Sequence, residues 1–196
     1  MWWYSLYFYY RKGNTMRKKA LTGRALPRPL LIVVLGLPGA GKTTFARALS
    51  ERLGARHFNT DIIREELGLS GRYSPADKER VYEAMAAHAK AALRENQAVI
   101  VDGTFYHPSL RAPYRQMSAD AGCPLHWIQP EAPEALSRRR VSRQRPHSEA
   151  DYDVYLSIRK AWVPLEEGHL RLSSDESPEQ MVDKALAYLR AQYPGL

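Results

Sequence analysis

Four residues with a fixed spacing could together bind phosphate. Gly36, Gly41, Lys42 and Thr43 form the pattern GxxxxGK(S/T), a phosphate-binding P-loop. Its glycines let successive backbone N–H groups point at one anion. Lys42 is expected to reach the β- and γ-phosphates of ATP, and the Thr43 hydroxyl to hold Mg²⁺. The expected nucleotide-binding residues are Gly36, Leu37, Pro38, Gly39, Ala40, Gly41, Lys42, Thr43 and Thr44.

The sequence around this motif supports the phosphate site. Six apolar residues, 30–35, precede it, and a helical pattern over 42–53 follows. A strand before the loop and a helix after it are the context that a P-loop requires, and the helix adds its positive dipole end. A chance glycine-rich turn is the alternative, and these flanking elements argue against it.

A carboxylate follows the next predicted strand. Asp61 is interpreted as a general base that accepts the proton of an attacking hydroxyl, because phosphoryl transfer depends on an oriented nucleophile. A helix N-cap is the alternative interpretation of Asp61. Arg64, three residues on, shares a helix face with it and is a candidate for binding a phosphate or carboxylate of the acceptor. A surface pair with the neighbouring glutamates is the alternative for Arg64.

A second carboxylate ends an apolar run. Asp102 follows residues 98–101, a pattern typical of the Walker B strand, whose aspartate supports Mg²⁺ opposite the P-loop hydroxyl. An Asp-Gly turn is the alternative. Thr104 is a weaker candidate for contacting the substrate.

An arginine-rich segment spans residues 138–145. Small P-loop kinases place a lid at this point of the chain, whose arginines neutralise the charge of the transferring phosphoryl group. Arg139 and Arg143 are the chosen catalytic candidates. A solvated basic face or an RNA-contacting patch is the alternative.

Strand and helix patterns alternate along the whole chain. Strands are expected at 30–35, 55–59, 98–101, 124–128 and 169–172. Helices are expected at 42–53, 62–67, 108–121, 131–145, 148–162 and 178–193. A further helix is expected to start at Ser74-Pro75, with an apolar face made of Val81, Met85, His88 and Ala92. This alternation predicts an α/β fold, the three-layer P-loop NTPase type, with a mostly parallel five-stranded sheet and a helical arginine-rich lid. Its strands should end at one rim, where the P-loop, Asp61 and Asp102 would meet.

Length and composition are consistent with one domain. The chain has 196 residues, of which 44% are hydrophobic, and a single cysteine, which favours a reducing, cytoplasmic setting. No run approaches the 18 apolar residues that a membrane span needs. The net charge is +8, but residues 11–28 carry seven basic side chains and no acid, which leaves +1 on the remainder. The charge therefore predicts a nucleic-acid partner only weakly.

The first residues differ from the rest. Residues 1–15 are rich in aromatic side chains but lack the features of a secretory signal. We expect an upstream-extended start with Met16 as the natural initiator; a membrane-surface or partner-docking arm is the alternative. Residues 1–28 are expected to be a disordered basic and aromatic extension, and residues 29–196 the functional domain.

Four segments together resemble a known family. GLPGAGKTTFA, TDIIR, VIVDGTF and RRRVSRQRPHSEADYDVYLSIRKAW are similar to segments of the predicted AAA-type P-loop kinases. These resemble the kinase domain of phage polynucleotide kinase and, more distantly, zeta-toxin-like, gluconate- and adenylate-type kinases. The resemblance implies that Asp61 is the general base, that Arg64 holds a substrate phosphate, and that the lid arginine lies within residues 138–145.

The leading hypothesis is an ATP- and Mg²⁺-dependent kinase that phosphorylates a hydroxyl. The acceptor is either a polynucleotide 5′-OH or a small metabolite. A nucleotide-switched binding module, in which turnover is incidental, is the second hypothesis. Asp61 discriminates the two, because a base is needed only for transfer.

Overall fold

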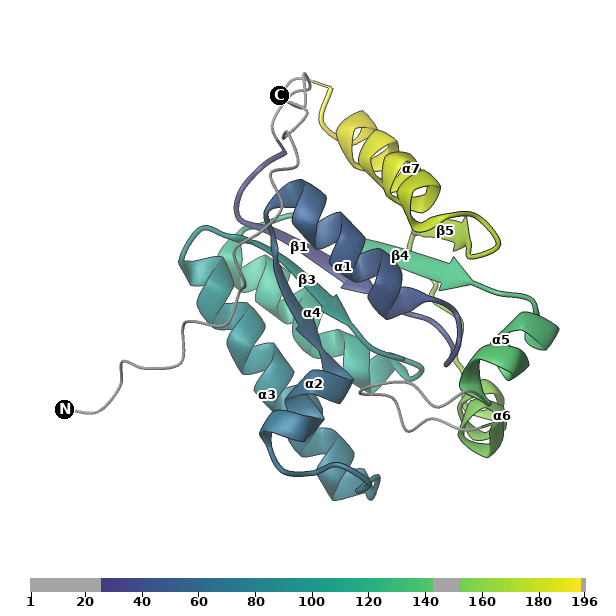
Figure 1. The fold of residues 1–196 in the computed structure, drawn as a ribbon. Coiled ribbons are helices and arrows are strands. Elements are labelled where there is room, and N and C mark those ends of the chain that lie inside the picture. Colours follow the sequence, from purple (N-terminus) through teal and green to yellow (C-terminus); the bar gives the residue numbers. More distant parts are fainter. Residues whose placement is uncertain (1–25, 143–151, 195–196) are drawn as a thin grey trace, which may run out of the picture.

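The computed structural model describes residues 26–142 and 152–194. The expectations for residues 1–15 and Met16, and the candidate Arg143, lie outside these ranges. Within them the chain forms five strands and seven helices (Figure 1). The strands are β1 (Leu30–Val34), β2 (Arg56–Asn59), β3 (Ala98–Asp102), β4 (Leu125–Glu131) and β5 (Leu170–Ser173). The helices are α1 (Lys42–Leu53), α2 (Thr60–Glu66), α3 (Pro75–Arg94), α4 (Pro108–Ala121), α5 (Glu134–Val141), α6 (Tyr152–Lys160) and α7 (Pro178–Ala191).

The strands form one sheet in the order β2-β3-β1-β4-β5, and every pairing is parallel. The α/β fold predicted from the alternating pattern is thus confirmed. Both β1 and β3 are buried along their whole length. Their continuous apolar sequences follow from this position, because a central parallel strand is covered on both faces.

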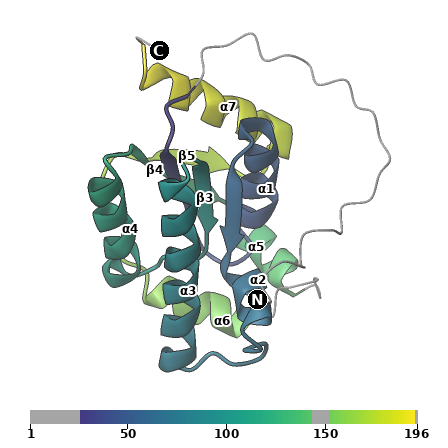
Figure 2. The ribbon, with the colours of Figure 1, turned by 90° about the vertical axis from the view of Figure 1, so that its left-hand side faces the viewer.

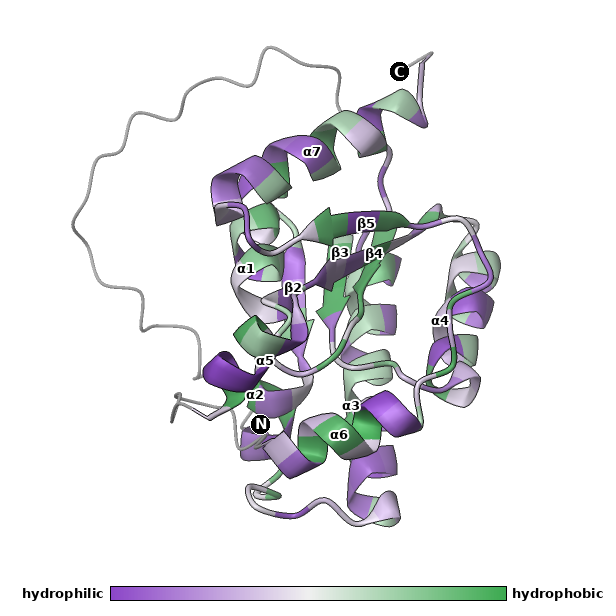
Figure 3. Ribbon diagram, turned by 90° about the vertical axis from the view of Figure 1, so that its right-hand side faces the viewer, coloured by the Kyte–Doolittle hydropathy of each residue, from purple (hydrophilic) through white to green (hydrophobic). Residues whose placement is uncertain are grey.

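Helices cover both faces of the sheet, which makes three layers (Figure 2). Alternate residues of β1 divide between two cores, with Leu31 and Val33 facing α3 and α4, and Ile32 facing α1 and α7. This division follows from the two-residue repeat of a strand. Figure 3 shows β3 as mainly hydrophobic, whereas hydrophobic and hydrophilic residues alternate along the helices.

Two helix starts follow the sequence signals closely. Ser74 caps α3 by accepting the N–H of Asp77, and Pro75 occupies the first turn. Ser177 caps α7 in the same way, with the Gln180 side chain completing a capping box. Short polar residues before a proline therefore predicted both starts.

Several boundaries and one helix face differ from the expectations. The helix expected at 131–145 starts only at Glu134, because Glu131 still belongs to β4. Helix α2 starts at Thr60 rather than residue 62, because Asn59 caps it. Strand β4 continues to Glu131, since its last residues pair with β5. On α3 the buried position belongs to Ala89, while His88 is exposed and only touches the edge of the Phe58 ring. A helix places positions three or four apart on one stripe, and this one runs through residues 81, 85, 89 and 92.

Parallel strands deliver their carboxyl ends to one rim of the sheet. The P-loop follows β1, α2 follows β2, and residues 103–107 follow β3 on this rim. Helices α2, α5 and α6 lie beyond the rim (Figures 1 and 3). Among the described helices, none combines the length and the apolarity that crossing a bilayer requires.

Candidate active site

The P-loop is shaped by glycines that no other residue replaces easily. Gly39 and Gly41 have φ angles of 79° and 82°, in the left-handed region that favours glycine. A Cβ on Gly39 would lie 2.8 Å from the Ser137 carbonyl oxygen of α5. Gly41 is the N-cap of α1, and because glycine has no side chain it cannot cap the first N–H groups of this helix. The start of α1 thus has the open N–H groups and positive dipole of an anion site.

Lys42 lies over the loop in which phosphate would sit. Its Nζ donates to the Leu37 carbonyl oxygen at 2.9 Å. The side chain therefore folds back across the P-loop rather than extending to solvent. This places an ammonium charge beside the N–H groups of the loop, where an anion would be stabilised.

Two predicted magnesium-site residues from distant parts of the chain meet on this rim. The Thr43 hydroxyl donates to Asp102 Oδ1 at 3.1 Å. Asp102 is 1% exposed and ends the buried strand β3. The Asn59 amide adds a donor to both groups, at 3.1 Å from Thr43 Oγ1 and 2.8 Å from Asp102 Oδ1.

The second oxygen of Asp102 is bound as well. His57 Nε2 lies 2.6 Å from Asp102 Oδ2. His57 and Asn59 stand two residues apart on β2 and therefore share a face of the strand. Asp102 thus has hydrogen-bond partners on both oxygens, and these partners fix the plane of its carboxylate.

The donor set of this group fits Mg²⁺. The hydroxyl of Thr43 and the carboxylate of Asp102 are hard oxygen ligands, and Mg²⁺ usually takes one or two such protein ligands and completes its shell with water and phosphate. In the described part of the chain, no three His, Cys, Asp or Glu residues gather as a metal cluster. The site suits an ion shared with a nucleotide rather than a permanent protein-bound metal.

One cleft joins the phosphate site to Asp61. It has a volume of about 570 Å³ and runs from the P-loop past α2 to α6. The predicted residues Lys42, Thr43, Thr44, Asp61, Arg64, Asp102 and Thr104 all line it. The predicted P-loop residues Pro38, Gly39 and Gly41 line it as well, and further lining residues include Arg47, Asn59, Tyr73, Lys78, Tyr82, Tyr106, Val154, Ser157 and Ile158.

Asp61 lies in the first turn of α2, at the cleft wall. The N-cap interpretation of this residue is wrong, because Asn59 holds that position. The Asn59 Oδ1 atom accepts the N–H groups of Asp61 and Ile62 at 2.8 and 3.1 Å. Asn59 therefore makes the N-cap contacts of α2.

Arg64 is buried where α2 meets the loop before α3. It is 6% exposed, donates to the Arg72 carbonyl oxygen, and places its guanidinium carbon 4.4 Å from the centre of the Tyr73 ring. Its Nε has no hydrogen-bond partner among the described residues. A buried donor without a partner is costly, and Arg64 also lines the cleft. The surface-pair interpretation of Arg64 does not fit this burial.

Thr104 is held by a partly buried tyrosine. The hydroxyl groups of Thr104 and Tyr82 lie 3.2 Å apart, and the Tyr82 hydroxyl also accepts the N–H of Phe105 at 3.3 Å. Burial raises the pKa of Tyr82 above its ordinary value, so the phenol keeps its proton at neutral pH. The neutral Tyr82 hydroxyl thus holds the loop after β3 through its contacts with Thr104 and Phe105.

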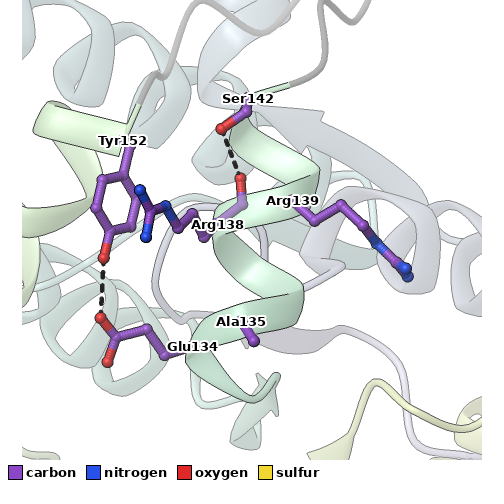
Figure 4. A pocket seen from close by; sticks show the side chains of 6 residues that line it. All are labelled: Glu134, Ala135, Arg138, Arg139, Ser142 and Tyr152. Carbon is purple, nitrogen blue, oxygen red and sulfur yellow. Dashed lines mark hydrogen bonds between the residues drawn. The ribbon is translucent and has the colours of Figure 1, made fainter.

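The described arginines of the predicted lid lie at different places. Arg139 belongs to a separate shallow hollow, where it points away from Arg138 (Figure 4). Arg138 stacks on the Tyr152 ring, whose hydroxyl donates to Glu134 at 2.9 Å. The hollow is lined by Glu134, Ala135, Arg138, Arg139, Ser142 and Tyr152. Arg139 does not line the cleft as the structure describes it, and its catalytic role stays a prediction.

Arg140 instead contacts the P-loop. Its Nη1 donates to the Gly39 carbonyl oxygen at 3.1 Å and to Ser174 Oγ at 2.8 Å, and its Nη2 donates to the Ser174 carbonyl oxygen at 2.9 Å. This side chain ties α5 and the turn after β5 to the phosphate loop.

Sequence reasoning missed His57, Asn59 and Arg140. The signal for Asn59 was its place at the end of a strand before a helix, where asparagine is a favoured cap. His57, two residues earlier, shares its strand face. No local signal distinguished Arg140 from its neighbours, because its partners are far away in the sequence.

The part of the chain that contains these residues matches a protein-family model described as an AAA domain, over residues 31–163. The chain belongs to this AAA domain family. The match includes the P-loop, α2 and the end of β3, and it continues through the arginine-rich segment to the end of α6.

Relatives of this AAA domain include kinases. An uncharacterized protein of Mycobacterium tuberculosis is 30% identical over 168 residues, which cover 79% of this chain and 34% of that protein. The chain thus spans about a third of the length of the first curated relatives it matches. A shikimate kinase of Corynebacterium glutamicum is 28% identical over 167 residues, which cover 81% of this chain and 96% of that enzyme.

Solved kinase structures share the fold of this AAA domain. The APS kinase CysC of Mycobacterium tuberculosis, in complex with AMPPNP and APS, aligns with a TM-score of 0.66 at 21% identity. The alignment covers 83% of this chain and 98% of that one. At this identity the likeness shows the fold alone. Fold and relatives together describe a P-loop kinase-like domain.

Proposed function

We propose that residues 29–196 form an ATP- and Mg²⁺-dependent kinase domain that transfers the γ-phosphate of ATP to a hydroxyl group. One observation carries the proposal: Asp61 lines the same cleft as Lys42, Thr43 and Asp102. A module that only binds a nucleotide needs Lys42, Thr43 and Asp102. An additional carboxylate such as Asp61 serves the transfer of phosphate to an acceptor.

The phosphate side of the cleft binds and neutralises charge. The N–H groups of the P-loop and the start of α1, together with Lys42, would bind the phosphates of ATP. Thr43 and Asp102 would hold Mg²⁺, which supplies neutralisation of the phosphate charge when bound. His57 and Asn59 orient the Asp102 carboxylate for this task.

The acceptor side of the cleft contains the base. Asp61 would accept the proton of the acceptor hydroxyl as its oxygen attacks the γ-phosphorus. Arg64 would bind a phosphate or carboxylate of the acceptor, which gives its unpartnered Nε an acceptor atom. Thr104, at the cleft wall, would contact the same molecule.

The lid arginines would complete the site in the closed state. Arg139 and Arg143 are proposed to stabilise the transferring phosphoryl group. For Arg139 this role requires its side chain to turn from the hollow of Figure 4 toward the cleft, because α5 already contacts the P-loop through Arg140. Closure of this kind is common in kinases, where it excludes water from the reaction.

We infer that the acceptor is a small molecule rather than a polynucleotide 5′ end. The cleft volume of about 570 Å³ lies within the range of small-ligand pockets. The shikimate kinase relative, matched over nearly its whole length, supports the same class. The resemblance to polynucleotide kinase keeps a 5′-OH end as the second acceptor class.

The test is transfer of labelled γ-phosphate from ATP with Mg²⁺ to an acceptor panel. The panel holds 5′-OH DNA and RNA oligomers and pooled sugars, nucleosides and hydroxy acids. Asp61→Asn should lower the rate of transfer about 10²–10⁴-fold, because it removes the base. It should leave ATP binding intact, and Asp120→Asn, on the exposed side of α4, should change neither.

A second variant tests the phosphate side. Lys42→Ala should lower transfer about 10²–10³-fold through lost charge stabilisation, whereas Lys90→Ala on the exposed face of α3 should not. ATP binding without transfer to any acceptor would overturn the kinase proposal. The nucleotide-switched module would then be the better description.

A further inference from the structure

Asn59 joins the two halves of the cleft through one side chain. It is 4% exposed and lies at the end of β2, directly opposite Asp102 in the register of the parallel strands. Its Nδ2 donates to Thr43 Oγ1 and Asp102 Oδ1, at 3.1 and 2.8 Å. Its Oδ1 accepts the N–H groups of Asp61 and Ile62. The donor end of one planar amide thus contacts the predicted magnesium site, and the acceptor end holds the helix that carries Asp61.

The chemistry of the amide makes this arrangement specific to asparagine. Serine, aspartate and asparagine all cap helices well, because each has a side-chain oxygen for the free N–H groups. Of these, only asparagine also carries two N–H donors beside that oxygen. An aspartate at position 59 would cap α2 but would place a carboxylate against Asp102. A serine would cap α2 without reaching Thr43 and Asp102 through an N–H group.

The short length of α2 makes its cap important for Asp61. The helix has seven residues, and helices of this length are marginal without tertiary contacts. Both N–H groups that Asn59 accepts belong to the first turn, one of them to Asp61 itself. A shift of the Asn59 amide therefore moves the backbone of Asp61 directly.

We propose that Asn59 is a positioning residue that couples occupancy of the Thr43–Asp102 magnesium site to the position of Asp61. The magnesium and base roles in this coupling rest on the function proposed above. An ion held by Thr43 and Asp102 would further restrain the two oxygens that receive the amide protons of Asn59. The amide is then fixed, and its oxygen fixes the first turn of α2. The base is thus ordered when the phosphate side is loaded.

Hydrogen exchange of the Asp61 and Ile62 amides measures this coupling without an acceptor. The protein is saturated with AMP-PNP, either with EDTA or with excess Mg²⁺, and residue-resolved exchange is followed by NMR. In the unaltered protein, Mg²⁺ should slow exchange of these two amides about tenfold, because it fixes the cap. The comparison between the two conditions isolates the effect of the ion from that of the nucleotide.

Two variants separate the coupling from simple capping. Asn59→Ser keeps a capping oxygen, so both amides should stay protected but lose their response to Mg²⁺. Asn59→Ala removes the cap, so both should exchange rapidly with and without the ion. Ser177→Ala removes the cap of α7, outside the cleft, and should leave the Mg²⁺ response of Asp61 and Ile62 unchanged. A Mg²⁺ response in Asn59→Ser equal to that of the unaltered protein would overturn the proposal.

Kinetics distinguish failure of this proposal from failure of the proposed function. If the unaltered protein transfers phosphate, Asn59→Ser should lower kcat about 10–100-fold and leave the affinity for Mg²⁺-free AMP-PNP unchanged. If it transfers phosphate to no acceptor, the kinase proposal fails, but the exchange experiment still decides the coupling. Normal kcat together with a retained Mg²⁺ response in Asn59→Ser would refute the coupling alone.

Discussion

His57 Nε2 contacts Asp102 Oδ2 at 2.6 Å, and this bond connects the edge strand β2 to the carboxyl end of β3. Asp102 is fully buried, with an exposed fraction of 1%, whereas the His57 side chain is 13% exposed. The contact completes the hydrogen bonding of Asp102, whose other oxygen accepts from Thr43 and Asn59. Asp102 is therefore held from three sides before any ion binds.

Removal of this contact should weaken the proposed magnesium site. His57→Ala leaves Asp102 Oδ2 without its partner, so we expect the affinity of the AMP-PNP complex for Mg²⁺ to fall about 10–100-fold. Calorimetric titration of Mg²⁺ into that complex measures the change. Binding of Mg²⁺-free AMP-PNP should stay the same, and His88→Ala, at an exposed position of α3, serves as the control. Equal Mg²⁺ affinity in His57→Ala would show that the contact does not support the site.

A methyl group at Gly39 should disrupt phosphate binding. Gly39→Ala adds strain of about 1–2 kcal/mol at a positive φ and also drives Cβ to 2.8 Å from the Ser137 carbonyl oxygen. We expect AMP-PNP affinity to fall more than about tenfold, since the P-loop backbone must shift. Gly122→Ala carries similar φ strain with open space around its Cβ, so it should cost stability but leave binding intact. Equal binding losses in both variants would exclude the clash with Ser137 as the cause.

The branched guanidinium group of Arg140 should contribute more to nucleotide binding than its charge alone. Arg140→Lys keeps the charge but cannot make the three bonds to Gly39 and Ser174 at once. We expect AMP-PNP affinity to fall about tenfold, which corresponds to the loss of roughly one charged hydrogen bond. Arg171→Lys alters an exposed pair with Glu131, also bound at two points, and should change the affinity little. An affinity unchanged by Arg140→Lys would contradict the structural link.

The stability of the fold should fall in mild acid through His126. Burial lowers the pKa of this imidazole below its ordinary value of 6.5, in a contact with the Tyr193 hydroxyl and the Tyr188 ring. In the unfolded chain His126 takes up a proton near that ordinary value, while in the folded chain it takes up the proton only at a lower pH. The unfolded state therefore binds more protons, and the contribution of His126 to stability is lost as the pH falls through about 6.5.

Urea unfolding at about pH 7.5 and about pH 5.5 measures this loss. The free energy of unfolding should fall less between the two pH values in His126→Gln than in the unaltered protein, because glutamine does not titrate. His88→Gln removes an exposed histidine and should keep the full pH dependence. An identical fall in His126→Gln would contradict the assignment.

The sequence by itself determined the phosphate loop, the sheet and most helix starts. The motif Gly36 to Thr43 lies between an apolar strand and a helix. The motif, the apolar run and the helical pattern can each be recognised from a few neighbouring residues. The apolar run 98–101 predicted a buried strand that places Asp102 at the rim. Ser74 and Ser177 predicted the starts of their helices, because an N-cap side chain bonds to a backbone N–H only two or three residues further on. Such features follow from backbone geometry and from the burial of apolar side chains.

Only the tertiary structure decided the partners of these residues. The register of β2 against β3 sets Asn59 opposite Asp102, across 43 residues of sequence, and places His57 on the same face. Arg140 reaches Gly39 across 101 residues, while Arg139 beside it does not line the cleft. Parallel strands joined through helices bring such groups together, and neither the pairing register nor the direction of a side chain at a helix end follows from a local pattern.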